Sequence, residues 1–373
     1  MKQTSSDAFR GALEGSDVVL EFGHALPGAR TPGESKVDLD VRIAMPPVTA
    51  KRLILTLNEA IQRQERDVRF RRTDFPALAR APDRAQRGQK PINAPPDPSA
   101  EKAALLLRLV GDLGIPYQYE RSFRISADAL AANRYLLTLN TRDIPGGPLE
   151  RVLEICRHVG MPPQAHATAK QNFAMANCVH FGFEGDARSI IYKLYLERAV
   201  PELEARQARA AFEPVLQHLA FKWDVVKNVH VVTRYLWHPF LSEQQIEARL
   251  EEVYRQLAPS RSLEIAKAVM VLAAQRVPTE RLQYLEVQED ENARWSFDLN
   301  LYGARLQVKA IQTQLQAMRE HFRIRPGQFQ ALYDQIKNRP LGHVAGGVHR
   351  NGNDFFNVYY GVAGFPHFAE RFG

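Results

Sequence analysis

The sequence predicts an α+β fold: ten antiparallel strands close into a barrel with helices outside, preceded by a small β-β-α module. Two observations lead to this prediction. From residue 100 onward, five pairs of alternating strands are separated mostly by helical segments. The second strand of each pair has polar side chains at positions i and i+2, which therefore share one face. A closed barrel with a polar lumen and an outer face on helices fits this pattern and leaves no exposed edges.

The second strands of the five pairs align on one short pattern, at spacings of 55, 40, 67 and 57 residues, as expected for a repeated unit with variable connections. Four of the five copies end in tyrosine, whereas an ordinary solvent-facing strand favours Lys, Glu and Thr. The alternative is an open sheet whose polar face meets water. The five copies read Thr138-Leu139-Asn140, Lys193-Leu194-Tyr195, Thr233-Arg234-Tyr235, Asn300-Leu301-Tyr302 and Asn357-Val358-Tyr359.

The N-terminal module, residues 1–67, contains two predicted strands at 17–29 and 37–45 and an amphipathic helix at 49–66. It resembles a family of small bacterial proteins of unknown function, in which two strands precede a helix opening with P-x-x-A-K-R-L, here Pro47 to Leu53. That resemblance implies no chemistry. We interpret the module as an accessory docking or dimerisation unit, suited to recognising a peptide or partner protein.

Residues 68–99 are rich in Pro, Ala and Arg and show no periodicity, which predicts a linker between the module and a barrel domain at residues 100–373. Within the barrel domain, Gly and Pro residues end the helices, and Ser242 is a good N-cap. The predicted helices are 101–113, 148–159, 202–219, 242–257, 262–276, 306–321 and 326–337. The predicted strand pairs are 117–126 with 134–140, 179–184 with 190–197, 221–225 with 229–237, 283–288 with 294–302, and 341–349 with 354–362.

The composition indicates a soluble globular protein, with 45% hydrophobic and 24% charged residues. Its net charge of +7 favours an anionic partner: nucleic acid, a membrane surface or a phosphorylated small molecule. The two cysteines, Cys156 and Cys178, form no CxxC pair, so we expect neither a zinc site nor a disulfide scaffold. We expect a reduced, cytoplasmic setting. The N-terminus lacks the apolar core of a signal peptide. The most apolar predicted helix is too short for a membrane span.

Residues 100–373 resemble the aromatic prenyltransferase family, whose barrel consists of five αββα repeats around a solvent-filled chamber. The resemblance rests on the number of repeats, the order of elements and the polar i, i+2 pairs. It implies transfer of an allylic isoprenoid from its diphosphate to an electron-rich aromatic acceptor. That acceptor would be an indole, a phenol or an aromatic peptide side chain, and we rank the small aromatic molecules first. The family needs no aspartate-rich metal motif, and none of the DDxxD type occurs here, which implies no cofactor and no requirement for Mg²⁺.

The resemblance also implies roles for individual residues. Lysine and amide side chains bind the diphosphate, whose charge develops as it leaves. Tyrosine rings shield the allylic cation from water by cation–π attraction. The candidate diphosphate ligands are Lys193, Asn300, Arg294, Arg234 and Asn357, and the shield would comprise Tyr195, Tyr235, Tyr302 and Tyr359. Lys193 is the only lysine in the five aligned pairs, so the diphosphate hypothesis depends heavily on it.

Candidate general bases are Glu184, Glu286 and Asp298, because a carboxylate can accept the proton lost when the acceptor regains aromaticity. Asp298 shares a predicted strand face with Asn300 and would oppose a diphosphate unless it is paired. Arg294 lies on that same face, whereas Arg234 is out of phase with its neighbours. The roles of His180, His343 and His349 stay open, and no HxH or HExxH spacing indicates a metal.

Two other readings compete with the enzyme. A noncatalytic barrel that binds a hydrophobic or anionic ligand fits the reduced set of lumen cations. A nucleic-acid-binding protein fits the net charge and the arginine-rich linker. The nucleic-acid reading is the weaker one, because aromatic and basic residues do not interleave on a recognisable recognition strand.

Overall fold

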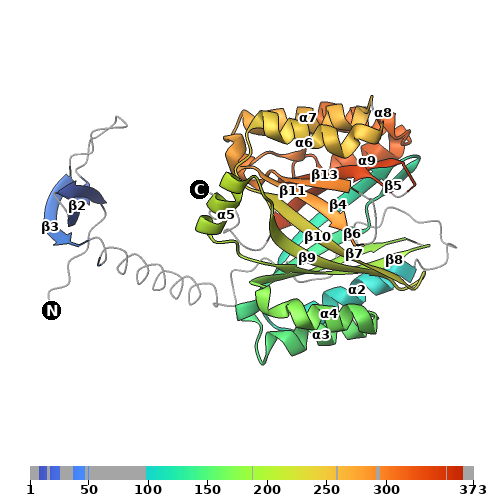
Figure 1. Ribbon diagram of the computed structural model, residues 1–373, viewed down its shortest axis with the longest axis horizontal. Helices are drawn as coiled ribbons and strands as arrows, with labels where there is room; N and C mark the ends of the chain where they lie inside the picture. The colour runs from blue at the N-terminus through green and yellow to red at the C-terminus, as the bar shows by residue number, and fades with distance from the viewer. Residues whose placement is uncertain are drawn as a thin grey trace. The chain divides into compact units, whose positions relative to one another are not determined.

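The computed structural model describes residues 8–14, 17–25, 37–46, 49, 98–186, 188–257, 259–290, 295–349 and 351–363. The chain divides into two compact units, residues 1–93 and 94–373 (Figure 1). None of the described helices is long and apolar enough to cross a membrane.

The first unit contains a three-stranded antiparallel sheet in the order β1-β2-β3. Its strands are β1 (Ala8–Glu14), β2 (Asp17–Ala25) and β3 (Val37–Met45). β2 and β3 confirm the two predicted strands, whereas β1 was not predicted from the sequence. The predicted helix 49–66, except for Thr49, lies outside the described residues, and so do residues 68–97 of the predicted linker. The division into module, linker and barrel domain therefore stays a prediction.

In the second unit ten antiparallel strands close into a barrel, because β14 returns to pair with β4. This confirms the predicted barrel and excludes the open sheet. The barrel strands, in spatial order, are β4 (Gln118–Ser126), β6 (Arg134–Asn140), β7 (Cys178–Gly185), β8 (Ile190–Glu197), β9 (Val215–Asp224), β10 (Val229–His238), β11 (Gln283–Glu289), β12 (Trp295–Asn300), β13 (Leu341–Val348) and β14 (Asp354–Ala363). A short strand, β5 (Ala129–Ala131), pairs with the end of β4.

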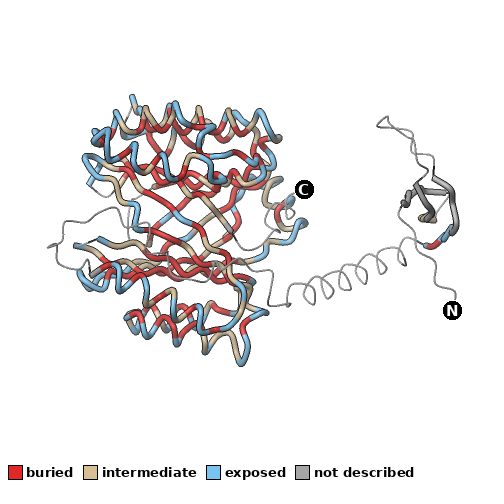
Figure 2. The backbone as a smooth tube through the Cα atoms, turned by 180° about the vertical axis from the view of Figure 1, so that it is seen from behind, coloured by how far each residue is buried: buried red, intermediate tan, exposed pale blue. Residues whose placement is uncertain are grey.

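Helices cover the outside of the barrel in two layers (Figure 1), and many of the strand residues between these layers are buried (Figure 2). One layer packs over Phe181, Leu194 and Phe221, and the opposite layer packs over Phe297 and Val358. The first layer contains α2 (Pro98–Gly111), α3 (Pro148–His158) and α4 (Pro163–Asn172); the second contains α6 (Glu243–Tyr254), α7 (Arg261–Ala274), α8 (Gln312–His321) and α9 (Pro326–Ile336). A further helix, α5 (Glu202–Ala211), lies between β8 and β9 in sequence and packs through Ala205 on Trp237 and Leu285.

The strand alternation separates helix-facing from lumen-facing residues, as β8 illustrates. Leu194 and Leu196 are buried in the apolar core under the first helix layer. Tyr195 and Glu197 line the cavity inside the barrel. Because successive side chains of a strand point to opposite faces, Lys193 also faces the lumen. The predicted arrangement, with a polar lumen and an apolar outer face, is confirmed.

Two predicted elements end early enough to change the description of the lumen. The helix predicted at 202–219 stops at Ala211, where Phe212 adopts the left-handed conformation (φ 57°), and β9 then begins at Val215. The strand predicted at 294–302 stops at Asn300, because the Oδ1 of Asn300 accepts a hydrogen bond from the backbone N–H of Tyr302 (3.1 Å) and a 3₁₀ turn follows. Both corrections affect lumen residues. The first places His218 in a barrel strand, and the second means that Asn300 and Tyr302 are not on one strand.

Candidate functional site

The lumen carries opposite chemistry at its two ends. Four neighbouring strands each contribute one residue to an ion-paired cluster at one end of the lumen and one residue to the other end. The two residues of each strand are four positions apart, which corresponds to about 13 Å. The four pairs are Arg124 and Glu120 on β4, Arg134 and Thr138 on β6, Glu184 and His180 on β7, and Lys193 and Glu197 on β8. The first residue of each pair belongs to what we call the cationic end, and the second residue belongs to the carboxylate–histidine end.

The cationic end is built around Glu184. Its carboxylate accepts a hydrogen bond from Lys193 Nζ (2.8 Å) and forms ion pairs with Arg124 (3.1 Å) and Arg134 (3.4 Å). The side-chain oxygen of Asn357, on β14, accepts from Arg124 Nε (2.9 Å) and Arg134 Nη1 (2.6 Å). Three cations therefore face one carboxylate. Lys193 and Asn357, two predicted diphosphate ligands, lie together there.

The charges at this end shift one another's pKa. Burial lowers the pKa of Lys193 to about 8, although the carboxylate of Glu184 partly opposes that shift. Burial works against the charged form of Glu184, but Arg124, Arg134 and Lys193 hold its pKa well below the usual range. Glu184 is therefore a counterion for the three cations, and the structure does not favour the predicted role as a general base. Gly182 lies opposite Lys193 and leaves room for its aliphatic chain, because a Cβ at Gly182 would lie 3.2 Å from Lys193 Cβ.

Tyrosine rings lie between the two ends. Tyr195 and Tyr235 contact each other edge to face, with ring centroids 5.6 Å apart. Tyr359 stacks on His343 at a centroid distance of 3.7 Å. The Nζ of Lys222, on β9, lies 5.5 Å from the centre of the Tyr235 ring. The i, i+2 pattern of the sequence correctly brings these three tyrosines to the lumen.

A cavity of about 110 Å³ lies next to the tyrosines, toward the carboxylate–histidine end. None of the described residues that line it is Lys or Arg. Its titratable lining residues include three acidic side chains and three histidines: Glu120, Glu197, Asp298, His180, His218 and His343. The cavity is smaller than a typical ligand pocket, which measures about 300–1,000 Å³, so larger ligands require side chains to move.

One part of this end is a cluster around His343. His343 Nδ1 lies 2.7 Å from Asp298 Oδ1, and its Nε2 lies 3.4 Å from Glu120 Oε2. Burial disfavours the imidazolium, but Asp298 and Glu120 outweigh that effect and raise the pKa of His343 to about 10. The hydroxyl of Tyr302 donates to the other oxygen of Glu120. Gly342 permits this contact, because a methyl group there would overlap Glu120 and Tyr302.

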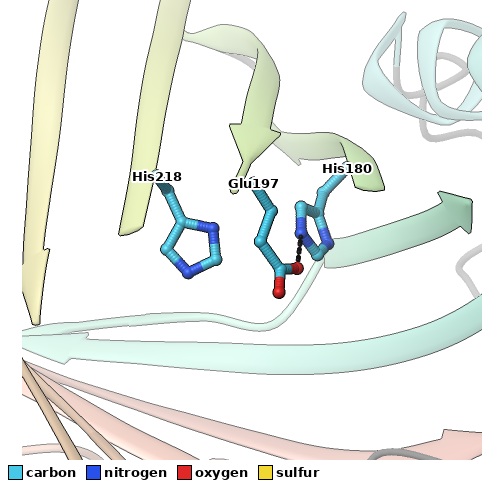
Figure 3. A group of neighbouring side chains, drawn as sticks. All are labelled: His180, Glu197 and His218. Carbon is cyan, nitrogen blue, oxygen red and sulfur yellow. Dashed lines mark hydrogen bonds and ion pairs between the residues drawn. The ribbon is translucent and has the colours of Figure 1, made fainter. Parts of the chain in front are cut away.

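The other part of this end contains His180, Glu197 and His218 from three adjacent strands, and their side chains converge (Figure 3). Their candidate metal-ligand atoms all lie within 4.8 Å of one another. His180 Nε2 lies 2.8 Å from Glu197 Oε2, and His180 Nδ1 lies 2.7 Å from Thr138 Oγ1. Burial lowers the pKa of His218 to about 4, so its imidazole is neutral at neutral pH.

Two predicted site residues lie outside the lumen, and a third cannot be placed. Glu286 is on the outer face of β11, where it pairs with Arg249 of α6 (2.8 Å) and His238 (3.2 Å), so it is not positioned as a lumen base. Arg234 is exposed and pairs with Asp290, as expected from its phase in the strand. Arg294 lies outside the described residues. Asp298 and Asn300 both line the cavity, and Asn300 donates to Gln283 (3.5 Å).

Several lumen residues were not found from the sequence. Glu120, Arg124 and Arg134 were missed because the repeat was compared only in the second strand of each pair, at its i, i+2 positions. The alternation of 118–126 and 134–140 contained the signal: Glu120, Ser122 and Arg124 are polar at every second position. His218 was missed because residues 202–219 were assigned to a helix, and Lys222 was missed because only the second strand of each pair was compared.

No protein-family model and no curated protein matches the sequence. Among solved structures, the chain is similar to a crystal structure of AnaPT from Neosartorya fischeri, with a TM-score of 0.41 and 15% identity, covering 68% of this chain and 79% of that one. It is also similar to a crystal structure of NotF prenyltransferase (TM-score 0.39, 12% identity, 66% and 80% coverage). NotF in complex with brevianamide F and DMSPP matches at a TM-score of 0.38 and 12% identity, with 66% and 80% coverage.

Proposed function

We propose that the barrel transfers an allylic isoprenoid from its diphosphate to an electron-rich aromatic acceptor. The observation that carries the proposal is the polarity of the lumen, with cations at one end, carboxylates and histidines at the other, and tyrosine rings between them. A reaction that splits an anionic leaving group from a carbocation, and then removes a proton, uses all three environments.

The diphosphate would bind at the cationic end, where Lys193, Arg124 and Arg134 offset its charge as the C–O bond breaks. The allylic cation then lies over Tyr195, Tyr235 and Tyr359, whose electron-rich faces stabilise it and exclude water. The acceptor carbon supplies the electron pair for the new C–C bond. Because these side chains supply the positive charge, we expect no requirement for Mg²⁺ at the diphosphate.

The acceptor would occupy the cavity at the carboxylate–histidine end. The proton released on rearomatisation passes to a carboxylate, and Asp298 lines the cavity in which the acceptor would lie. Glu120 is a second candidate. His343 contacts both carboxylates, at 2.7 Å from Asp298 and 3.4 Å from Glu120, and Glu120 also accepts a hydrogen bond from Tyr302. The volume of about 110 Å³ favours a small aromatic acceptor over a peptide side chain with its backbone.

The test incubates the full chain with dimethylallyl, geranyl and farnesyl diphosphates and a panel of indoles, phenols and aromatic peptides, without added Mg²⁺. We expect an acceptor mass increased by one prenyl group. Asp298→Asn should slow product formation by about 10²–10⁴-fold if Asp298 is the base. Arg234→Ala, a surface change, should leave the rate unchanged. The absence of any prenylated product across the panel would contradict the proposal.

The alternative is a noncatalytic barrel that holds a hydrophobic or anionic ligand. The internal pairing of the three cations with Glu184 favours a hydrophobic ligand in such a barrel, because a bound diphosphate would compete with that carboxylate. Calorimetric measurement of donor binding, read together with the product assay, separates the two functions. Donor binding without product formation, for every acceptor tested, would support the noncatalytic barrel.

A further inference from the structure

We propose that His180, Glu197 and His218 bind a divalent transition metal such as Zn²⁺ in the wall of the lumen. This site goes beyond the proposed prenyl transfer, because the diphosphate would bind at the opposite end of the lumen. No short motif in the sequence indicates it, since the three residues are 17 and 21 positions apart. Only the closure of β7, β8 and β9 into one wall brings them together.

The backbone places all three side chains on one patch of the lumen. Glu197 and His218 are directly opposite in the β8–β9 register. On β7, Cys178 pairs with Glu197, and His180 lies two residues further along on the same face. A metal held about 2.0–2.2 Å from each ligand requires ligand atoms roughly 3.3 Å apart. Because these atoms already lie within 4.8 Å of one another, small side-chain rotations suffice.

The two histidines are prepared as ligands in different ways. Nδ1 of His218 is buried and neither accepts nor donates a hydrogen bond among the described residues. A metal ion would give that nitrogen a partner. His180 is held through Nδ1 by Thr138 Oγ1 (2.7 Å), and its Nε2 is directed at Glu197 (2.8 Å). A hydrogen bond on the nitrogen that does not bind the metal is the usual support for a ligating histidine.

The formal charge of the cavity favours a dication. Glu120, Glu197 and Asp298 contribute three negative charges, and His343 contributes one positive charge, which leaves −2 when His180 and His218 are neutral ligands. A divalent ion would cancel this charge. Two imidazoles and one carboxylate are also the ligand set of a zinc site with an open coordination position. That position would face the cavity, where water or an oxygen atom of a ligand completes the coordination.

The experiment titrates the metal-free 373-residue chain with Co²⁺, followed by visible absorption, and with Zn²⁺, followed by calorimetry. We expect one metal per chain and the absorption bands of a four- or five-coordinate Co²⁺ site. His218→Ala, or His218→Gln where the alanine variant does not fold, and Glu197→Gln should weaken binding by at least about 100-fold. Thr138→Val should weaken it by about 10-fold through His180. His230→Gln, on an exposed histidine of β10, should bind as the parent does.

Two results would overturn the site. One is the absence of Zn²⁺ and Co²⁺ binding by the parent protein. The other is unchanged metal affinity in a folded His218 variant. Neither result depends on prenyl transfer, since no donor or acceptor is present in the titration.

Discussion

The ammonium of Lys193 lies 2.8 Å from the carboxylate of Glu184 on the neighbouring strand β7. The sequence predicted a diphosphate ligand in the first residue and a base in the second. The contact makes them partners, and a diphosphate that bound there, as we propose, would replace or join an internal anion. Arg124 and Arg134 contact the same carboxylate, so removing the charge of Glu184 would leave three cations without this counterion.

Replacing Glu184 with Gln removes the counterion and keeps the shape of the side chain. We expect the free energy of unfolding to fall by about 3 kcal/mol, because three buried or half-buried cations lose their anion. Added inorganic diphosphate should then raise the melting temperature of Glu184→Gln more than that of the parent. Equal shifts in the two proteins would show that diphosphate does not reach this cluster.

The affinity for a diphosphate should depend on the protonation of Lys193. Its pKa of about 8 in the free protein rises when an anion binds, so binding takes up a proton. Affinity should therefore be level from pH 7 to about 8 and fall at higher pH. In Lys193→Arg the guanidinium stays charged, and the fall should disappear. Calorimetry at several pH values measures both proteins, and a fall of the same size in the arginine variant would count against Lys193.

Gly342 should be sensitive to the addition of a single methyl group. In Gly342→Ala the new Cβ overlaps Glu120 and Tyr302, so the hydrogen bond between these two residues must break or shift. We expect a loss of about 1–3 kcal/mol in stability. Gly303→Ala is the matched control, because nothing lies within 4 Å of its Cβ position. Thermal unfolding of both variants measures the difference, and equal melting temperatures would contradict the proposed contact.

His343 should stabilise the fold in a pH-dependent way. Its pKa is raised to about 10 in the folded protein, against about 6.5 in the unfolded chain. Its contribution is therefore complete below pH 6.5 and is lost as the pH rises toward 10. The stability difference between the parent and His343→Gln should shrink over that range. Urea unfolding at intervals of one pH unit tests this, and a difference that stays constant would rule out a charged His343.

The fold was predictable from the sequence where its signals are local. Residues 134–140 alternate and are bounded by turns, and the observed strand β6 has the same limits. The segment after Ala211 failed because the turn at Phe212 depends on a left-handed backbone conformation that residue type does not indicate. Helical and strand patterns overlap there, and only pairing with β8 and β10 decides between them.

The site was predictable only in part, for a different reason. The polar i, i+2 rule identified the side chains that face the lumen on β8, β10 and β14. It did not show which of them meet, because contacts across the closed barrel join residues far apart in sequence. Arg124 reaches Asn357 over 233 positions through the β4–β14 closure. The same closure determines that Glu184 neutralises cations and that three histidines gather at the other end.

We propose above all that the cationic end of the lumen binds the diphosphate of an allylic donor. Calorimetric titration of dimethylallyl diphosphate into the parent, Lys193→Ala and Lys227→Ala at pH 7 tests it most directly. We predict saturable binding to the parent, at least tenfold weaker binding to Lys193→Ala, and no change in Lys227→Ala, whose side chain is 58% exposed. Equal affinity of the parent and Lys193→Ala would contradict the claim.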